Sequence, residues 1–533
     1  MDIEKRKYSR WGIPLVFLLL WACVLPDMPE AGKVRCLAVS PDIFPAYADS
    51  LVLPPNMAPL NFRIKADTFS KGPYFVRFYA CDAAGNKIDS LRFRTNRFVQ
   101  FDIREWKRCM AAAMAGKGEV RLEIFGRSET QWVGYAPKVW KVVSDSIDPY
   151  IVYRLSAHDE NPCLRLQVVQ RSLCDFSQTV LMDNHLIENN CMNCHAGSDN
   201  DATKMLVHIR GRYAGTILFH RGKVLKIALP YDYPDLRLAY PSWSADGKFI
   251  AFASTRINVH PYVNSFRTQD IITDTLGRIL IYDVEHNRLF SSPELMDARY
   301  ENSFPAWSYD GKTLYFLRTS PWDSINKQGD AKQRLAAFRY RLAAVSFDAR
   351  TCTFGKVREV FNFGDQAYSL SMPSVSPDER YILATALTVG SFPSQNQGDL
   401  VLLKRRVPDA ESDFEETDAS LLNSPDGEKY HTWSSNGRWV VFGSKRINGA
   451  TAHIYIAYFD RDGHFSTPFV LPQEQKNFYL KNTRSFLFPT LNRNKADFTA
   501  WEWAEAVKRE PVYPDMEYFK SYRRKGGPIP AGH

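Results

Sequence analysis

Short apolar runs that alternate with polar residues and turns fill most of this chain, and they predict β-strands rather than long helices. Four segments share one order of residues: a strand, a tight turn and a second strand. They begin at Pro241, Pro305, Pro373 and His431, and their first positions lie 64, 68 and 58 residues apart. Recurrence at nearly constant spacing indicates a repeat architecture.

Each repeat predicts a β-hairpin, because an Asp-Gly or Asn-Gly pair between apolar runs is a strong turn signal. The strand after the turn, 249–252 in the first copy, is apolar on both faces, which is typical of a strand buried between sheets. Trp243, Trp307 and Trp433 recur at one repeat position. We therefore expect these tryptophans to pack between repeats rather than to contact a substrate.

The Pro-x-Trp-Ser-x-Asp-Gly-Lys core resembles the WD40-like PD40 repeats of TolB-type β-propellers over roughly residues 205–500. The third copy departs from this core, with Val375 in place of Trp and Glu379 in place of Gly. The resemblance implies a β-propeller over 205–505, followed by a C-terminal tail over 506–533. Six blades is the best count from the strands, with five or seven as alternatives.

Residues 45–155 form a different segment. Runs that begin at Leu60, Tyr74 and Val120 alternate apolar and polar residues with period two, which suggests an Ig-like β-sandwich. The stretch Arg104–Ala115 is rich in Ala and Met and predicts an inserted helix. The expected fold class is therefore mainly β: an N-terminal Ig-like β-sandwich, a linker over 156–204 and a C-terminal propeller.

Composition and charge narrow the class of protein. With 45% hydrophobic residues the chain can build packed cores, which excludes a mainly disordered protein. The net charge of +9 is mild and scattered, so nucleic acid is not an expected partner.

The N-terminus predicts export. Four basic residues among the first ten precede an apolar stretch over 11–25, which is shorter than the ~20 residues of a spanning helix and typical of a signal peptide. Leu20-Trp21-Ala22-Cys23 resembles a bacterial lipobox, which implies a signal peptide over 1–23 and a lipid on Cys23. The alternative is an ordinary cleaved signal. We expect a location in the periplasm or at the outer membrane, with the lipid holding the chain to a membrane surface.

One short motif carries the candidate chemistry. Residues 191–195 read Cys191-Met192-Asn193-Cys194-His195, and C-x-x-C-H is the attachment signature of c-type haem. A helical turn would present both thiols to the vinyl groups at one porphyrin edge, and the adjacent imidazole is the proximal iron ligand. We therefore expect one covalent haem c, held by Cys191 and Cys194, with His195 on the iron, in a loop and short helix.

The same residues could instead form a structural zinc site, a redox-active thiol pair or a structural disulfide. A structural zinc site needs a second ligand pair at short spacing, and none follows. A thioredoxin-like redox pair needs a βαβ context, and a Cys191–Cys194 disulfide would close a strained ring. Export favours haem among these alternatives.

The sixth iron ligand stays open at this stage. Met182, His185, Met205 and His208 are nearby candidates, and His208 is favoured over Met205. Residues 205–210 alternate as a strand, so Met205, Val207 and Ile209 share one face and His208 lies on the other. Arg210 and Arg212 are candidate partners for the haem propionates. Because His195 lies close in sequence to the first propeller strand, we expect the haem at the propeller edge near His208 rather than in the channel.

Six further cysteines, namely Cys36, Cys81, Cys109, Cys163, Cys174 and Cys352, could form up to three bridges. The sequence does not assign their pairing. Cys163–Cys174 is the favoured pair, and free buried thiols are the alternative.

The combined features resemble exported Gram-negative bacterial proteins that are labelled cytochrome c or cytochrome c biogenesis proteins. The resemblance implies a haem-bearing propeller that transfers electrons or binds a redox or protein partner at the propeller face. Two alternatives remain: a protein- or peptide-binding scaffold with a structural haem, and a haem enzyme such as a peroxidase.

Overall fold

A computed structural model describes residues 34–525, except 66–67, 130, 158–164, 235, 265–266, 325–332, 334, 336, 365, 367, 393–397 and 407–412. The signal segment and Cys23 lie outside the described residues, and Cys194 is described by its backbone only. Within the described part, no helix is long and apolar enough to cross a membrane.

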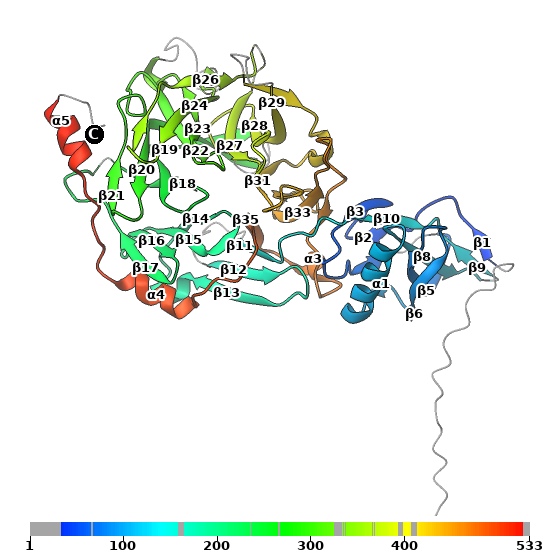
Figure 1. Ribbon diagram of the computed structural model, residues 1–533. Coiled ribbons are helices and arrows are strands. Elements are labelled where there is room, and N and C mark those ends of the chain that lie inside the picture. Colours follow the sequence, from blue (N-terminus) through cyan, green and yellow to red (C-terminus); the bar gives the residue numbers. More distant parts are fainter. Residues whose placement is uncertain are drawn as a thin grey trace, which may run out of the picture.

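The N-terminal domain consists of two sheets and one helix (Figure 1). The larger sheet has seven strands, in which β8 is central. They are β1 (Val34–Cys36), β3 (Ser50–Leu53), β5 (Lys71–Cys81), β6 (Lys87–Thr95), β8 (Glu119–Arg127), β9 (Trp132–Gly134) and β10 (Lys138–Val142). The smaller sheet contains β2 (Ile43–Phe44), β4 (Phe62–Ile64) and β7 (Phe98–Val99).

Helix α1 (Ile103–Ala115) confirms the inserted helix. The side chain of Asp102 accepts hydrogen bonds from the backbone N–H of Arg104 and Glu105, which caps the first turn. Trp106 on its buried face stacks on Phe78 of β5 at 4.7 Å between ring centroids. The domain is a two-sheet β structure, and its assignment to the Ig-like topology stays a prediction.

Six sheets follow one another around a ring and form the blades of a β-propeller (Figure 1). Blade 1 holds β14 (Met192–Ser198), β15 (Asp201–Ile209), β16 (Gly215–His220) and β17 (Lys223–Ile227). Blade 2 holds β18 (Ala239–Trp243), β19 (Phe249–Asn264), β20 (Arg267–Asp283) and β21 (Arg288–Phe290). Blade 3 holds β22 (Glu301–Trp307), β23 (Thr313–Thr319), β24 (Arg341–Asp348), β25 (Thr353–Phe354) and β26 (Arg358–Phe361).

Blade 4 holds β27 (Ser369–Val375), β28 (Tyr381–Leu387), β29 (Asp399–Arg405) and β30 (Phe414–Thr417). Blade 5 holds β31 (Glu428–Trp433), β32 (Trp439–Ser444), β33 (His453–Tyr458) and β34 (Phe469–Val470). Blade 6 joins β35 (Ser485–Asn492) to β11 (Tyr150–Ser156), β12 (Leu166–Ser172) and β13 (Gln178–Asp183). Short helices lie in the connections between strands and after the last blade: η2 (Asn184–Ile187), η3 (Trp322–Ser324), η4 (Ser420–Leu422), α3 (Phe478–Lys481), α4 (Ala500–Lys508) and α5 (Glu517–Arg524).

The ring is closed by a sheet built from both ends of the propeller. The late strand β35 pairs antiparallel with the early strand β11. The innermost strands β14, β18, β22, β27, β31 and β35 each contact the next, and β35 contacts β14. This closed ring confirms the predicted mainly β fold class and the best count of six blades.

The propeller begins at Tyr150 rather than at residue 205. The segment 156–204, which we expected to be a linker, contributes β12 and β13 to blade 6 and β14 to blade 1. The strand β11, which joins β12 and β13 to the ring, pairs with β35 about 330 residues later in the chain, so local patterns do not reveal this blade. The predicted tail also contains structure, because Val512 and Asp515 form bridges with the outer strands of blades 1 and 2.

A repeated side-chain clasp explains the hairpin signature. In blade 2 the hydroxyl of Ser244 donates to Asp246 Oδ1 at 2.6 Å and accepts from the backbone N–H of Phe249 across the turn. The same clasp recurs at Ser308, Ser376 and Ser434. The fourth turn residue has φ between +59° and +77° in the four copies, and the value of +59° belongs to Glu379, where a Gly would be less strained.

The recurring tryptophans join neighbouring blades, as predicted. Trp243 Nε1 donates to Ala196 O of blade 1 at 3.3 Å, and Trp433 Nε1 donates to Ser374 O of blade 4 at 3.1 Å. Trp307 packs on Phe347 of its own blade and is buried in the hydrophobic core that blades 2 and 3 share.

The N-terminal domain shares one continuous hydrophobic core with blade 5. Trp439 of β32 is fully buried, and its Nε1 donates to Asp145 O in the connection between domains at 2.9 Å. The described cysteines outside the C-x-x-C-H motif, among them Cys174, are free thiols. Cys163, the favoured partner of Cys174, lies outside the described residues.

Candidate functional site

The innermost strands share a bulge that turns side chains into the propeller channel. Tyr240, Phe304, Met372, Tyr430 and Phe488 all have φ between +47° and +57°. Each lies where the pairing with the neighbouring strand shifts by one residue. Non-glycine residues rarely adopt this conformation, and bulges of this kind re-aim side chains beside functional sites. The residue after each bulge residue is Pro in four of these blades and His431 in blade 5.

The C-x-x-C-H motif occupies the same bulge in blade 1. The pairing of β14 with β15 shifts between Asn193 and Ala196, so Cys194 and His195 lie in the bulge. His195 thus takes the position that Pro241 holds in blade 2. The expected loop and short helix around the motif are wrong, because 192–198 form a strand. The sequence signal for this was His195-Ala-Gly-Ser, a degenerate copy of Pro241-Ser-Trp-Ser.

The six innermost strands enclose a cavity of about 320 Å³ in the propeller channel, which we call the central cavity. Its wall contains His195, the five bulge residues with positive φ, and the Pro or His that follows each of them. Aromatic rings and proline rings make this wall largely apolar. Ligand pockets of proteins commonly have volumes of ~300–1,000 Å³ and a mainly apolar lining.

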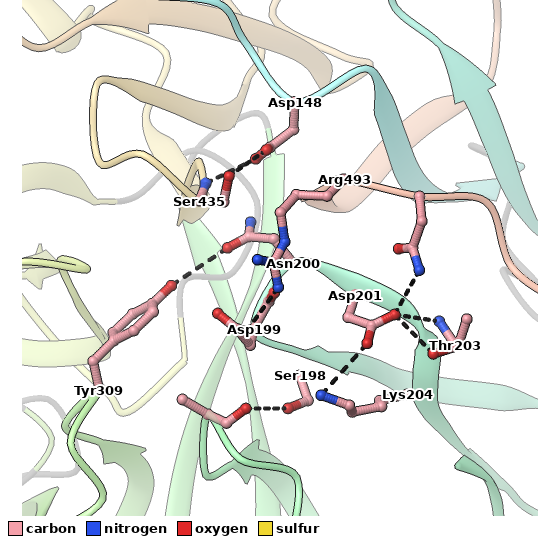
Figure 2. A network of polar contacts seen from close by, with 12 residues as sticks. Asp148, Ser198, Asp199, Asn200, Asp201, Thr203, Lys204, Tyr309, Ser435 and Arg493 are labelled. Atoms are coloured by element: carbon pink, nitrogen blue, oxygen red, sulfur yellow. Dashed lines mark hydrogen bonds and ion pairs between the residues drawn. The ribbon is translucent and has the colours of Figure 1, made fainter. Parts of the chain in front are cut away.

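The turn between β14 and β15 contributes Asp199 and Asn200 to the lining of the central cavity, and Figure 2 shows their polar contacts. Asn200 is buried there, and its amide donates to Trp433 O of blade 5 at 2.9 Å and to Leu491 O of blade 6 at 2.8 Å. The hydroxyl of Tyr309 in blade 3 donates to Asn200 Oδ1 at 3.3 Å. Arg493 holds the neighbouring Asp199 at 2.7 Å. One amide thus connects the first blade to three others.

Aromatic side chains fill the channel on the other side of the bulge. Tyr240 stacks on Phe304, and Tyr430 packs on Phe488, each with centroids 4.1 Å apart. Phe392, from the loop after β28, lies 6.0–6.3 Å from Tyr240, Phe304 and Tyr430 and so links the two pairs. The β19–β20 hairpin of blade 2 reaches this loop and bridges to Phe392 through Ile272.

His195 is only 6% exposed and faces the central cavity. Neither ring nitrogen makes a hydrogen bond of good geometry to a described residue. Burial, and then the charge of Arg154, lower the pKa of His195 to about 3, while a weaker hydrogen-bonding contact with the Phe488 backbone raises it. The imidazole is therefore neutral at physiological pH and keeps a free lone pair, which is the form that binds a metal.

Arg154 of β11 is the cation beside the motif, and sequence reasoning missed it. Its Nη1 donates to Asn193 Oδ1 at 2.7 Å, and its guanidinium lies 4.9 Å from the Phe488 ring centroid. The sequence pattern assigned residues 150–155 to the N-terminal domain. It therefore did not predict that β11 lies close to residues 192–195.

His431 also lines the central cavity and is 4% exposed. Its Nε2 lies 2.8 Å from Leu383 O. A carbonyl only accepts, so Nε2 carries the proton and Nδ1 carries the lone pair. Nδ1 makes no hydrogen bond of good geometry to a described residue. Burial lowers the pKa of His431 to about 4, while contacts with the backbone of Leu383 and Met372 oppose this shift.

The predicted ligand His208 faces a different cavity. It lies on β15, its Nδ1 is 3.1 Å from Thr216 Oγ1, and it lines a cavity of about 610 Å³ together with Arg210. Arg212 is exposed and pairs with Glu188 at 2.9 Å. The structure thus places His195 and His208 in the walls of two different cavities, and His195 lines the channel rather than the edge near His208.

The methionine candidates are core residues. Met205 and Met182 are fully buried with Val207 and Ile209 in the hydrophobic core between blades 6 and 1, which confirms the predicted strand face. His185 is exposed. Cys191 directly precedes β14 and packs at the edge of the same core, and its carbonyl accepts from Arg210 N at 2.9 Å.

Asp274 of β20 is a fully buried carboxyl group behind the aromatic cluster. It accepts hydrogen bonds from Ser303 at 3.0 Å and from Tyr240 at 3.2 Å. Burial raises its pKa to about 6 despite these donors. No three acidic, Cys or His side chains of the described residues form a cluster suited to a metal ion.

Comparisons with known proteins add a fold-level likeness. No protein-family profile and no characterised protein match this sequence. Hydrazine synthase of Kuenenia stuttgartiensis is similar in structure at 12% identity and a TM-score of 0.28, covering 51% of this chain and 64% of that chain. Prolyl oligopeptidase B of Galerina marginata matches at 11% identity and a TM-score of 0.31, covering 66% and 42%. Oligogalacturonate lyase of Vibrio parahaemolyticus matches at 11% identity and a TM-score of 0.29, covering 59% and 92%.

The chain thus spans less than two thirds of the first two proteins. TM-scores this low do not support an argument about the fold. The assignment of the propeller fold is therefore based on the strand pairing within this chain.

We predict that Asn200→Ala lowers the free energy of unfolding by about 3 kcal/mol. The change leaves the carbonyls of Trp433 and Leu491 without their donor and puts a Cβ-bearing residue without a polar group at φ +51°. Urea unfolding followed by tryptophan fluorescence measures it. Asn200→Gly is the matched control, because it loses the same hydrogen bonds but tolerates the positive φ, so it should cost less than Ala. Wild-type stability in both variants would contradict the role of this turn.

We predict that Asp274 makes stability fall as pH rises from about 4 to about 6. Its folded-state pKa of about 6 lies above the ordinary 3.8, so the folded state binds the proton more tightly. The penalty is absent below the unfolded pKa and complete above the folded pKa, where it amounts to about 3 kcal/mol. Asp274→Asn removes it. The stability of the variant relative to wild type should therefore increase over this range in unfolding experiments, and parallel pH profiles would exclude the effect.

Proposed function

We propose that this chain is an exported c-type haem protein in which Cys191 and Cys194 hold one haem and His195 binds the iron. The observation that carries the proposal is the imidazole of His195, which is buried in the wall of the central cavity without a hydrogen bond of good geometry. A buried polar group without a partner is costly unless a ligand completes it. Axial coordination to iron would complete it.

The donor types are those of haem c, but the strand places the Cys191 side chain at the edge of the core between blades 6 and 1 and not in the wall of the central cavity. Thiols at positions 191 and 194 and an imidazole at 195 are the groups that c-type attachment uses. The central cavity is lined by aromatic and proline rings, which suit an apolar macrocycle. When bound, the haem would supply one-electron transfer at iron. The chain's own residues would hold it covalently, exclude water through the aromatic cluster and place the Arg154 cation near the iron ligand.

Electron transfer or partner binding is the proposed role of this haem. A peroxidase-type enzyme needs an unengaged acid–base group near the iron. Among the described side chains that line the central cavity, Asp199 is held by Arg493 at 2.7 Å, whereas His431 offers an imidazole, so a peroxidase-type enzyme remains the alternative. The TolB-like likeness of the repeats adds a redox or protein partner at the propeller face to the proposal.

A second candidate is a binding scaffold with a structural haem or none. The observation that favours it is the central cavity itself, to which all six blades contribute. Such a scaffold would keep its binding function after loss of the thiols, whereas an electron-transfer protein would not.

The haem proposal predicts that Cys191→Ser/Cys194→Ser loses haem staining on a denaturing gel, because both thioether bonds are removed. The protein is produced with a c-type maturation system and exported before analysis. His195→Ala is the control: it should keep the stain but show an altered optical spectrum, since attachment and iron coordination use different residues. Haem staining of the double variant would exclude covalent attachment at this motif.

We also propose that the mature chain begins at a lipid-modified Cys23 and is held at the periplasmic or outer-membrane surface. The support is the basic and apolar N-terminal segment that ends at Leu20-Trp21-Ala22-Cys23. Mass spectrometry of the N-terminal peptide should show a diacylated or triacylated cysteine. Cys23→Ser should release the protein from the membrane fraction. An unmodified N-terminus at another residue would refute the anchor.

A further inference from the structure

We propose that a second cavity, between blades 1 and 2, binds a small organic anion in which a carboxylate or phosphate group is carried on an apolar body. This inter-blade cavity has a volume of about 610 Å³. Its wall is formed by β15, by the turn at 211–214, by the segment 237–239 that leads into blade 2, and by the β19–β20 hairpin. Among the described residues, none lines both this cavity and the central cavity, so the inference does not depend on the haem proposal.

Three arginines gather at this cavity without an opposite charge in its wall. Arg210 comes from blade 1, Arg237 from the segment between the blades and Arg256 from blade 2, and all three are exposed. The described residues of the wall include no Asp or Glu, and no described carboxylate forms an ion pair with any of the three guanidinium groups. Like charges held together on a concave surface create a positive potential that attracts anions.

Other exposed arginines of the propeller do have acidic partners. Examples are Arg299 with Asp297 at 2.7 Å, Arg341 with Glu359 at 3.1 Å and Arg380 with Asp378 at 2.8 Å. The arginines of the inter-blade cavity therefore keep donors that arginines elsewhere on the propeller use for such pairs. A guanidinium group presents a planar fork of N–H donors, which matches a carboxylate or a phosphate with two parallel hydrogen bonds.

Polar contacts position the groups that line the inter-blade cavity. The Arg237 side chain donates to backbone carbonyls of its own loop, including Leu236 O at 2.9 Å, which orients it. Nδ1 of His208 lies 3.1 Å from Thr216 Oγ1. Burial, and then the charge of Arg210, lower the pKa of His208 to about 4, so this ring is neutral at physiological pH. His208 therefore contributes a hydrogen-bonding group, and the arginines contribute the charge.

Aliphatic side chains form much of the remaining wall. Leu238 and Leu276 line it, and Ile257 and Val259 of β19 line it while being 37% and 54% exposed. Because Ile257 and Val259 are two residues apart in a strand, their side chains lie on one face. A ligand with an apolar body would cover them, which an inorganic ion would not do. The volume of the cavity lies in the range of ~300–1,000 Å³ that is common for small-molecule sites.

A haem attached at the C-x-x-C-H motif does not account for this cavity, because neither Cys191 nor His195 lines it. Asn193, which stands between them in the sequence, does line it, and its Oδ1 accepts from Arg154 Nη1 at 2.7 Å. Strand β14 therefore contributes to the walls of both cavities. An anion in the inter-blade cavity would bind on one side of this strand, and His195 faces the central cavity on the other.

Isothermal titration calorimetry of the full-length protein in Tris chloride tests the proposal. The probes are phenyl phosphate and phenylacetate, which separate a phosphate from a carboxylate. At least one should bind, and benzyl alcohol, which has the ring without the charge, should not. Arg210→Gln and Arg256→Gln should each lower the association constant of the bound probe about tenfold, because each removes a charge-assisted contact. Arg341→Gln is the matched control, since it removes an exposed arginine of blade 3 and should leave binding unchanged.

Two further variants test the apolar wall and the independence from haem. Ile257→Ser should weaken the binding of the organic probe severalfold and leave any binding of inorganic phosphate unchanged. The Cys191→Ser/Cys194→Ser chain, which lacks the attachment thiols, should bind the probe as wild type does. Haem staining of the same samples reports separately on the haem proposal.

Several results would overturn the inter-blade site. They are no binding of either anionic probe, equal binding of benzyl alcohol, and wild-type affinity in both arginine variants. Inorganic phosphate that binds as tightly as the organic probe would exclude the apolar part of the ligand. Loss of binding in the double cysteine variant would assign the binding to the haem and would also contradict the proposal.

Discussion

The pairing of β35 with β11 is the interaction on which the rest of the molecule depends. Each blade buries its faces against two neighbours, so the ring gains its full apolar burial only when the last inner strand joins the first propeller sheet. That pairing brings residues 150–156 beside residues 192–195. It also gives the channel its sixth wall, to which Phe488 contributes. The candidate site therefore exists only in the closed ring.

The local part of the fold could be predicted from the sequence. The Ser-x-Asp-Gly turns are set by contacts within five residues, such as Ser244 with Phe249, so their signature is visible in each copy. The faces of 205–209 followed from the period of a strand. The recurrence of Trp243 and Trp433 was enough to predict contacts between blades.

The remaining features depend on pairings over long distances or on degenerate copies. Blade 1 lacks the Trp and the Asp-Gly turn, because Gly197 stands at the Trp position and the two-residue turn Asp199-Asn200 replaces the longer one. The motif was therefore not recognised as part of a repeat, and a helical turn was expected around it. His431 was visible as the first residue of a copy. That His431 and His195 stand at equivalent repeat positions appears only once blade 1 is recognised as a copy.

In a ring of six similar blades, the six positions around the axis are nearly equivalent. The two histidines remove this equivalence, because blade 6 separates them on one side and blades 2, 3 and 4 separate them on the other. The arc from blade 5 to blade 1 also carries Arg154 and the Phe488 ring, whereas the opposite arc presents prolines and aromatic carbon. The wall of the channel thus has two chemically different sides. A molecule in the centre would meet a different environment in each of six rotated orientations.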